Sequence, residues 1–317
     1  MKKTWYLIIG VVLLVIGCIA YGYHEHYKPK TAQELKTVRV AYLPITHALP
    51  VFATKELETA DGPVHVELVK YGSWPELMDA LNTGKVDAAA VLVELGVKAR
   101  EQGIDVRAAA LGHTEGNIII VNKDINSVQD LKGKSFAIPH KQSTQKILVD
   151  CMLEEAGLSE KDVQIVEMSP PEMPSALSVG QIAGYSVAEP FGSLALEMGT
   201  GKVFEDPDHL WHDNICCALV FNGQFVDEHH DLAKAFTKAY LDAGKYLDEH
   251  PKAQEEISLK YMKFNDPVIE RSLKVIGFKD LALTEDRYNA LVHHMTHIDL
   301  IKNVPSYSEF VDQSLLP

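Results

Sequence analysis

The chain has 317 residues, of which 46% are hydrophobic and 23% charged, and it carries a formal net charge of −14 at pH 7. This length and composition predict a folded globular protein with room for two domains of ordinary size. The acidic balance argues against a nucleic-acid-binding protein, because phosphate backbones bind basic surfaces, but it leaves open an anionic small ligand held by a local positive field.

The first 23 residues predict an export segment. Lys2 and Lys3 precede a long apolar run, an arrangement that places the start of the chain on the cytoplasmic side of a membrane. We therefore expect residues 1–23 to be a signal or a membrane anchor, and residues 24–36 to be a linker. Val15-Ile16-Gly17-Cys18 resembles the lipobox of bacterial lipoproteins, which makes Cys18 the candidate lipidation site. An uncleaved anchor is the alternative, since about 20 apolar residues span a bilayer.

From residue 38 onward, apolar strands alternate with amphipathic helices, a pattern that predicts a parallel sheet with right-handed crossovers. In the first part of the chain we expect three strands, at residues 38–44, 64–71 and 86–94. Ser73-Trp74-Pro75-Glu76 predicts a helix start with a capping box, and Thr46 lies near the start of the preceding helix.

The middle of the chain predicts a second lobe. Residues 117–123 are expected to cross into it, and residues 214–222 to return to the first lobe as a strand. From Gln224 onward the sequence predicts mainly amphipathic helices. We therefore assign residues 37–117 and 218–317 to lobe 1 with a helical tail, and residues 118–217 to lobe 2.

An internal repeat supports this division. Both copies contain Ala-Leu-x-x-Gly followed by an apolar strand and a glutamate. The matching residues are Ala80, Leu81, Gly84 and Glu94 in the first copy, and Ala176, Leu177, Gly180 and Glu189 in the second. In each copy a helix is expected to end at the glycine, which has no Cβ to hinder a left-handed cap. Two copies of one α/β unit imply two similar lobes, and a cleft between lobes is a usual place for a small ligand.

The segments VAYLPITHALPVFATKEL, YGSWPELMDALNTGKVDAA, DLKGKSFAIP and AEPFG resemble the solute-binding proteins of bacterial ABC importers. The most similar group is the nitrate, bicarbonate, taurine, sulfonate and thiamine-precursor family (NitT/TauT, NMT1-like). The resemblance covers roughly residues 38–300. It implies an α/β, type II periplasmic-binding-protein fold, with two α/β lobes around a ligand cleft and a helical C-terminal part.

Ligands in such folds bind beyond the carboxyl ends of the parallel strands, where helix N-termini favour anions. This rule selects four loops. The candidate ligand-binding residues are Pro44, Thr46, His47, Ser73, Trp74, His140, Gln142, Ser143, Thr144, Glu189, Pro190 and Phe191.

The chemistry expected of these residues differs along the chain. Ser143 and Thr144, at a strand-to-helix turn, are the expected oxyanion donors, and His47 and His140 are candidate positive donors. For the two histidines, a surface position in a loop is the alternative. Likewise Ser73-Trp74 has a structural alternative, in which the serine only caps a helix and the tryptophan only packs against it.

Two carboxylates bear on the identity of the solute. Glu94 and Glu189 end the repeated strands, and a carboxylate facing the cleft repels a simple anion. They therefore favour a zwitterionic or amine-bearing solute over nitrate. No basic residue that would neutralise a bound anion is assigned by the resemblance.

No metal site is expected. The chain has no Cys-x-x-Cys spacing, and Cys216 and Cys217 lie in a β-like run that predicts side chains on opposite faces, as small buried hydrophobes. His293 and His297 lie one helical turn apart, a spacing that suits a metal ion, but a solvated helix face is the favoured interpretation.

The resemblance therefore implies a capture protein rather than an enzyme, with no cofactor. It is expected to be a monomer, tethered by a lipid or by its N-terminal helix on the extracytoplasmic face of the bacterial cytoplasmic membrane. There it holds a small anionic or zwitterionic solute, such as nitrate, bicarbonate, a sulfonate, taurine or a thiamine-pyrimidine-like compound, and delivers it to an ABC permease. The alternatives are a tethered ligand-sensing module for a membrane receptor and a thiamine-pyrimidine-synthase-like enzyme.

Overall fold

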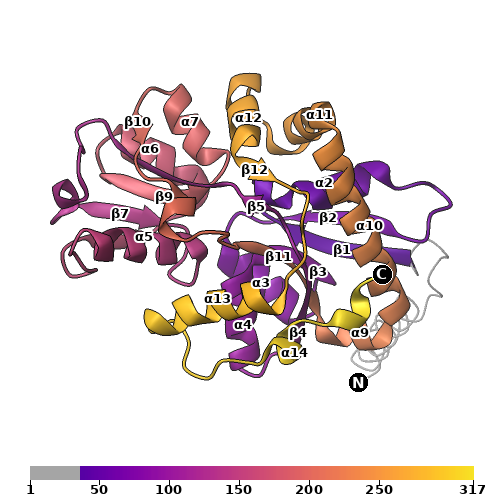
Figure 1. The fold of residues 1–317 in the computed structure, drawn as a ribbon. Coiled ribbons are helices and arrows are strands. Elements are labelled where there is room, and N and C mark those ends of the chain that lie inside the picture. The colour runs from indigo at the N-terminus through magenta and orange to yellow at the C-terminus, as the bar shows by residue number, and fades with distance from the viewer. Residues whose placement is uncertain (1–35) are drawn as a thin grey trace, which may run out of the picture. The chain divides into compact units, whose positions relative to one another are not determined.

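The computed structural model describes residues 36–317, and the compact unit discussed below begins at Val38 (Figure 1). The expected signal or anchor, almost all of the linker and the candidate lipidation site Cys18 lie outside the described residues. Within residues 36–317, no helix combines the length and the apolar character needed to span a bilayer.

A five-stranded sheet forms the first half of the unit, with the strand order β2-β1-β3-β11-β4. Its strands are β1 (Thr37–Tyr42), β2 (His65–Lys70), β3 (Ala88–Leu92), β4 (Val106–Leu111) and β11 (Cys217–Asn222). Strands β1 and β3 are parallel, whereas β11 runs antiparallel between β3 and β4. Every residue of β3 and of β11 is buried, as expected for strands covered on both faces.

A second five-stranded sheet has the order β10-β6-β9-β7-β8 and lies on the left in Figure 1. Its strands are β6 (Asn117–Asn122), β7 (Ser135–Ile138), β8 (Gln164–Glu167), β9 (Gly184–Ala188) and β10 (Gly201–Val203). Strand β7 is parallel to both neighbours, while β6 is antiparallel to β9 and β10. The chain passes between the sheets twice, through residues 112–116 and 204–216, which we call the crossing segments.

Helices cover the sheets and form most of the C-terminal part. The α-helices are α2 (Leu49–Leu57), α3 (Trp74–Asn82), α4 (Val93–Glu101), α5 (Thr144–Glu155), α6 (Met173–Ser178), α7 (Phe191–Glu197), α8 (Pro207–Leu210), α9 (Gly223–Glu228), α10 (His230–Glu249), α11 (Pro251–Met262), α12 (Asp266–Ser272), α13 (Glu285–His297) and α14 (Tyr307–Phe310). A two-stranded ladder joins β5 (Thr114–Glu115) to β12 (Ile276–Gly277). Short 3-10 turns occur at Thr46–Ala48, Val128–Leu131, Pro170–Glu172, Leu273–Val275 and Gln313–Leu315.

The helical C-terminal part contacts both sheet regions. Helices α10 and α11 pack against α2 of the first-sheet region, and α12 packs against α7 of the second (Figure 1). His297, the last residue of α13, contacts Glu154 of α5, with His297 Nε2 3.1 Å from the carboxylate. The tail, which the sequence analysis assigned to lobe 1, therefore contacts both regions.

The glycine caps predicted by the internal repeat are confirmed. Gly84 and Gly180 follow α3 and α6 with φ values of +68° and +72°, in the left-handed region. In each copy the next residue closes the helix with a backbone hydrogen bond: Lys85 N–H donates to Ala80 O and Gln181 N–H to Ala176 O, both at 2.9 Å. This 6→1 bond is the Schellman motif, so the two copies share a helix end as well as a sequence pattern.

Two local predictions in the first-sheet region were wrong in detail. Ser73 is the N-cap residue of α3, but its side chain makes no capping hydrogen bond, so the predicted capping box is not formed. Strand β3 ends at Leu92, and Glu94 lies in the first turn of α4 instead of ending the strand. A glutamate in that position faces the positive end of the helix dipole.

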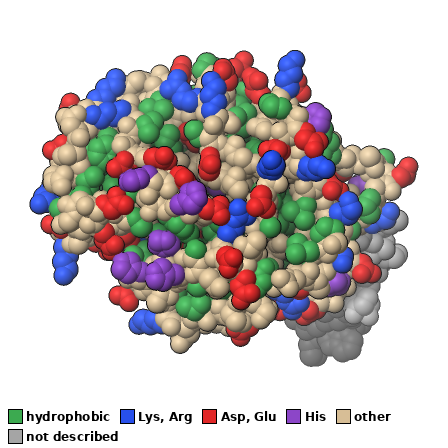
Figure 2. All heavy atoms as spheres, viewed as in Figure 1, with side chains coloured by type: hydrophobic (Ala, Val, Ile, Leu, Met, Phe, Trp, Pro, Cys, Tyr) green, Lys and Arg blue, Asp and Glu red, His purple; other side chains and the backbone are tan. Residues whose placement is uncertain are grey.

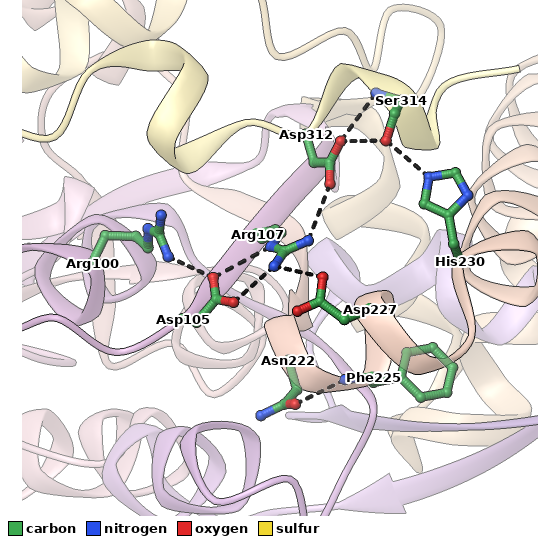
Figure 3. Close-up of polar contacts among 9 residues, drawn as sticks. All are labelled: Arg100, Asp105, Arg107, Asn222, Phe225, Asp227, His230, Asp312 and Ser314. Carbon is green, nitrogen blue, oxygen red and sulfur yellow. Dashed lines mark hydrogen bonds and ion pairs between the residues drawn. The ribbon is translucent and has the colours of Figure 1, made fainter.

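Acidic and basic side chains are interspersed over the face shown in Figure 2, so the net negative charge does not gather there in one patch. A tightly paired group lies near the C-terminus, around Arg107 of β4 (Figure 3). Its guanidinium lies 2.8 Å from Asp105, 2.9 Å from Asp227 of α9 and 3.7 Å from Asp312. Asp105, and after it Asp227, raise the pKa of Arg107 above its ordinary value. One cation thus links three segments of the chain.

Replacing Arg107 by methionine is expected to lower the free energy of unfolding by about 1–3 kcal/mol, because Asp227 and Asp312 then lose their cation and Asp105 keeps only Arg100. Urea denaturation at low salt measures this loss, which should shrink in 1 M NaCl. Lys274→Met is the matched control, since Lys274 pairs only with Glu270 and both side chains are more than 60% exposed. Equal losses in the two variants would contradict a special role for Arg107.

Candidate functional site

Four metal-ligating side chains converge where the crossing segments meet the first sheet. His47 lies in the turn after β1, His113 follows β4, and Cys216 and Cys217 lie at the start of β11. All four are at most 1% exposed, and one ligand atom from each falls within 4.8 Å of the others. We call these four residues the His–Cys cluster.

The two cysteines face the same way. Their sulfur atoms lie 3.8 Å apart, and Cys217 Sγ is 3.5 Å from His47 Nδ1. The prediction of side chains on opposite faces was therefore wrong. Side chains alternate between the two faces of a sheet only within a strand. Because β11 begins at Cys217, Cys216 belongs to the crossing segment, and its sulfur can point toward that of Cys217.

The imidazole of His47 is held in a defined orientation. Its Nε2 lies 3.0 Å from the carbonyl oxygen of Gly116, which can only accept, so Nε2 carries a hydrogen, and in the neutral ring Nδ1 presents a lone pair toward Cys217. The rings of His47 and His113 lie with their centroids 3.5 Å apart and their planes tilted by 32°.

The second-sheet region reaches the cluster through the N-terminus of α5. Gln145 Nε2 donates to Asn117 Oδ1 at 2.7 Å and lies 3.3 Å from Cys216 Sγ. The hydroxyl of Thr144, the preceding residue, lies against Glu94 Oε1 and 2.7 Å from the carbonyl oxygen of Ile215. Polar groups from both sheets thus meet at one buried place.

A second bridge joins the two regions at Glu189. Thr46 donates both its N–H and its hydroxyl to the Glu189 carbonyl oxygen, each at 3.0 Å. The Glu189 carboxylate accepts from Ser193, from its N–H at 2.9 Å and from its hydroxyl at 2.8 Å. The Glu189 side chain therefore caps α7, and the Glu189 backbone carbonyl binds the loop that contains Thr46.

Burial governs the ionisation of these groups. It raises the pKa of Glu94 well above its ordinary value and also raises the pKa of Glu189. Burial, helped by the neighbouring His47, lowers the pKa of His113 to about 4, so this ring is neutral at pH 7. Burial alone would raise the pKa of the Cys216 thiol, but the Cys217 thiol and the two histidines together hold that pKa well below its ordinary value.

Within residues 36–317, several buried polar atoms of this site have no hydrogen-bond partner. They are both ring nitrogens of His113, Glu94 Oε2 and Gln145 Oε1. An unpaired buried donor or acceptor costs about 1–3 kcal/mol, so native proteins retain such atoms mainly where they have a use. Trp74 Nε1 is also buried without a partner, at the start of α3.

Of the residues predicted to bind ligand, the structure brings four to the junction of the sheets: Thr46, His47, Thr144 and Glu189. Phe191 lies at the start of α7, with its ring 5.5 Å from that of Phe264 in the C-terminal part. Pro44 and Ser73 are partly exposed, and Pro190 is buried directly before α7.

The loop before α5 is satisfied by its own bonds. Ser143 caps the helix by accepting from Lys146 N–H, and it donates to His140 O at 2.6 Å. His140 Nδ1 in turn accepts from Gln142 N–H at 3.0 Å. Since a hydroxyl has one hydrogen, Ser143 has none left for an anion in this arrangement, and its predicted role as an oxyanion donor stays a prediction.

Sequence reasoning missed His113, Gln145 and the pairing of the two cysteines. The adjacent cysteines were the one available signal, but their ligand partners come from segments about 100 and 170 residues away. The two predicted helix-face histidines have other neighbours: His297 contacts Glu154, and the ring of His293 lies 5.9 Å from that of His294.

A cavity of about 380 Å³ opens on the crossing segments next to the cluster. Its lining includes Gly116 and Asn117, the residues that contact His47 and Gln145, together with Asn214, whose side chain accepts from Asn117 Nδ2 at 3.1 Å. Gly116 and Asn117 thus line the cavity on one side and contact residues of the buried site on the other.

The model of the NMT1-like family matches residues 31–260. Among solved structures, the ligand-binding component of an ABC-type import system from Staphylococcus aureus, determined with zinc bound, is 35% identical, covers 88% of this chain and 97% of its own, and has a TM-score of 0.84. The taurine-binding periplasmic protein of Escherichia coli is 29% identical over 68% of this chain and 67% of its own length.

The nitrate import ATP-binding protein NrtC of Synechocystis is 25% identical over 68% of this chain, but the matched part spans only 36% of that protein. The similarity to the solved structure confirms the predicted periplasmic-binding-protein fold. The predicted family is confirmed as well.

Proposed function

This chain belongs to the NMT1-like family, and on that premise we propose that it is the solute-binding protein of an ABC importer. Two lobes, built on the two sheets, close around a small solute and present it to a membrane permease. A taurine-binding protein and the ligand-binding component of an import system are among the relatives, which favours binding over catalysis.

The observation that carries this proposal is the buried polar junction between the sheets. Thr46 and His47 approach it from the first-sheet region, while Thr144 and Glu189 approach it from the second. Groups held by two separate sheets change their spacing when the crossing segments bend. A solute that bonds to both sides therefore stabilises the closed form.

The chemistry of the junction disfavours a simple oxyanion. Among residues 36–317, the one buried Lys or Arg side chain is Lys146, and it is paired with Asp150 and Glu160. The buried carboxyl groups of Glu94 and Glu189 supply no positive charge in either ionisation state. We therefore propose a cationic or neutral solute, in agreement with the zinc in the Staphylococcus aureus structure and unlike the nitrate named for NrtC.

The proposed setting is the extracytoplasmic face of the cytoplasmic membrane, with the N-terminal segment as signal or anchor and Cys18 as its lipidation site. Tethering raises the local concentration of the protein at its permease, which favours repeated delivery by one molecule. We propose that the protein acts as a monomer with residues 24–36 as a linker.

A thermal-shift screen of the full chain tests the capture function. The panel contains nitrate, bicarbonate, taurine, an alkanesulfonate, an aminopyrimidine and Zn²⁺. A solute that binds only the folded state adds about 2.7 kcal/mol of stability at a hundredfold excess over its Kd, so it raises the melting temperature. Small-angle scattering should show a smaller radius of gyration with the same solute. A well-folded protein that neither responds to the panel nor becomes more compact overturns the proposal.

Thr144→Val is expected to weaken solute binding about tenfold, because the variant removes the hydroxyl that connects α5 to Glu94 and Ile215. Titration calorimetry with the solute found in the screen measures the change. Ser178→Ala is the control, since the Ser178 hydroxyl bonds only to Ser175 O on the exposed end of α6. Unchanged affinity in Thr144→Val would show that α5 does not take part in closure.

A further inference from the structure

We propose that the His–Cys cluster binds one Zn²⁺ ion through Cys216 Sγ, Cys217 Sγ, His47 Nδ1 and a ring nitrogen of His113. The assignment of zinc as the captured solute rests on the capture function proposed above. The binding site itself rests on the geometry of the four side chains.

The distances between the ligand atoms suit a tetrahedral zinc ion. With Zn–S bonds of about 2.3 Å and Zn–N bonds of about 2.0–2.1 Å, a tetrahedron has S···S edges of about 3.8 Å and S···N edges of about 3.5 Å. The structure has 3.8 Å between the two sulfur atoms and 3.5 Å between Cys217 Sγ and His47 Nδ1. These two edges need no rearrangement to accept the ion.

The surrounding groups orient the ligands as metal sites require. The Gly116 carbonyl accepts from His47 Nε2, which leaves Nδ1 free to ligate, and a backbone carbonyl is a common partner for a zinc-bound histidine. Gln145 Nε2 lies 3.3 Å from Cys216 Sγ, where it can donate to a metal-bound sulfur. Because Gln145 belongs to α5, metal binding at the cluster is coupled to the position of the second-sheet region.

His113 supplies the fourth ligand. Its two buried ring nitrogens make no hydrogen bond within the part of the chain that the structure describes, and they lie beside the other three ligands. A ring rotation would bring one nitrogen to the ion, away from its present stacking on His47. The ligand set is then two nitrogens and two sulfurs, which prefers zinc over magnesium or calcium, since those ions bind oxygen ligands.

Co²⁺ titration of the reduced, metal-stripped full chain tests the site. Co²⁺ occupies zinc sites, and its thiolate charge-transfer and visible bands report sulfur ligands and tetrahedral geometry. We expect saturation at one equivalent and loss of the bands when Zn²⁺ is added. Cys216→Ser and Cys217→Ser should each reduce the charge-transfer intensity by about half and weaken Zn²⁺ binding at least about 100-fold, and Gln145→Met should weaken it about tenfold.

Cys151→Ser is the matched control, because Cys151 lies on α5, outside the cluster, and the variant should keep the full spectrum. Thermal unfolding of each metal-stripped variant shows whether it is folded before titration. A Co²⁺ complex without thiolate bands, or bands that survive in the Cys216→Ser/Cys217→Ser double variant, overturns the site.

The two proposals fail in different ways. If the Co²⁺ bands appear but Zn²⁺ leaves the radius of gyration unchanged and another solute compacts the protein, the cluster is a resident metal site and zinc is not the captured solute. If an organic or anionic solute raises the melting temperature and no Co²⁺ bands appear, capture stands without the metal site. If neither occurs, both proposals are wrong.

Discussion

Gly184→Ala is expected to lower the free energy of unfolding by about 3 kcal/mol, because the residue lies in β9 at the centre of the second sheet. A Cβ atom there would lie 2.6 Å from the Phe136 ring, 2.8 Å from Val121 Cγ1 and 2.8 Å from the backbone oxygen of Ile120. Side chains can shift, but the backbone oxygen belongs to the β6–β9 ladder and cannot move without breaking it.

Thermal denaturation measures this effect, and the melting temperature should fall by about 6–10 °C. Gly180→Ala separates crowding from backbone strain. Gly180 has a φ of +72° but no atom within 4 Å of an added Cβ, so its replacement should cost only about 1 kcal/mol. If the two variants lose equal stability, crowding at Gly184 is not the cause.

Lys146→Met is expected to destabilise the protein by about 2–4 kcal/mol at pH 7.5, because it leaves the Asp150 carboxyl buried without its cation. Burial, partly offset by the hydrogen bond from Lys146, raises the pKa of Asp150 to about 6. Chemical denaturation measures the loss. Lys238→Met is the control: Lys238 and Asp242 form a pair with the same i,i+4 spacing, with both side chains at least 60% exposed, and its loss should cost under about 0.5 kcal/mol.

The cost of Lys146→Met should depend on pH. An acid whose folded pKa lies above its unfolded value loses stability as pH rises from its unfolded pKa to its folded pKa. Without Lys146 the pKa of Asp150 in the folded state rises further, so the loss of stability continues above pH 6. The variant therefore loses less stability at pH 5 than at pH 7.5. Lys146→Met/Asp150→Leu should restore most of the stability. A pH-independent cost would show that packing rather than charge is responsible.

The sequence allowed the repeated helix–strand units of the fold to be predicted, together with the ends of their helices. The Ala-Leu-x-x-Gly repeat predicted two helix ends with left-handed glycines, and both Gly84 and Gly180 adopt them. Such caps depend on one residue and its neighbours, so local sequence determines them. The C-terminal helices were also predictable from periodicity, but their contacts with both regions were not, because α12 meets α7 only through packing across about 75 residues of chain.

The candidate site was predictable only in part. The rule for parallel strands selected Thr46 and His47, since it follows from topology alone. It did not select His113, Cys216 or Cys217, because His113 and Cys216 lie on the crossing segments and Cys217 begins the antiparallel strand β11. The cysteine pair was misjudged because strand alternation was extended one residue beyond the start of β11.

The double attachment of the C-terminal part has a consequence for the release of solute. The α12–α7 packing and the His297–Glu154 contact lie outside the junction between the sheets, yet they also join the C-terminal part to the second-sheet region. Separation of the first-sheet and second-sheet regions must disrupt these surface contacts as well as the polar junction. In the proposed capture cycle, the residence time of the solute would therefore depend partly on these helices. A permease that binds the C-terminal helices and disrupts these contacts could accelerate release of the solute without competing for the binding site.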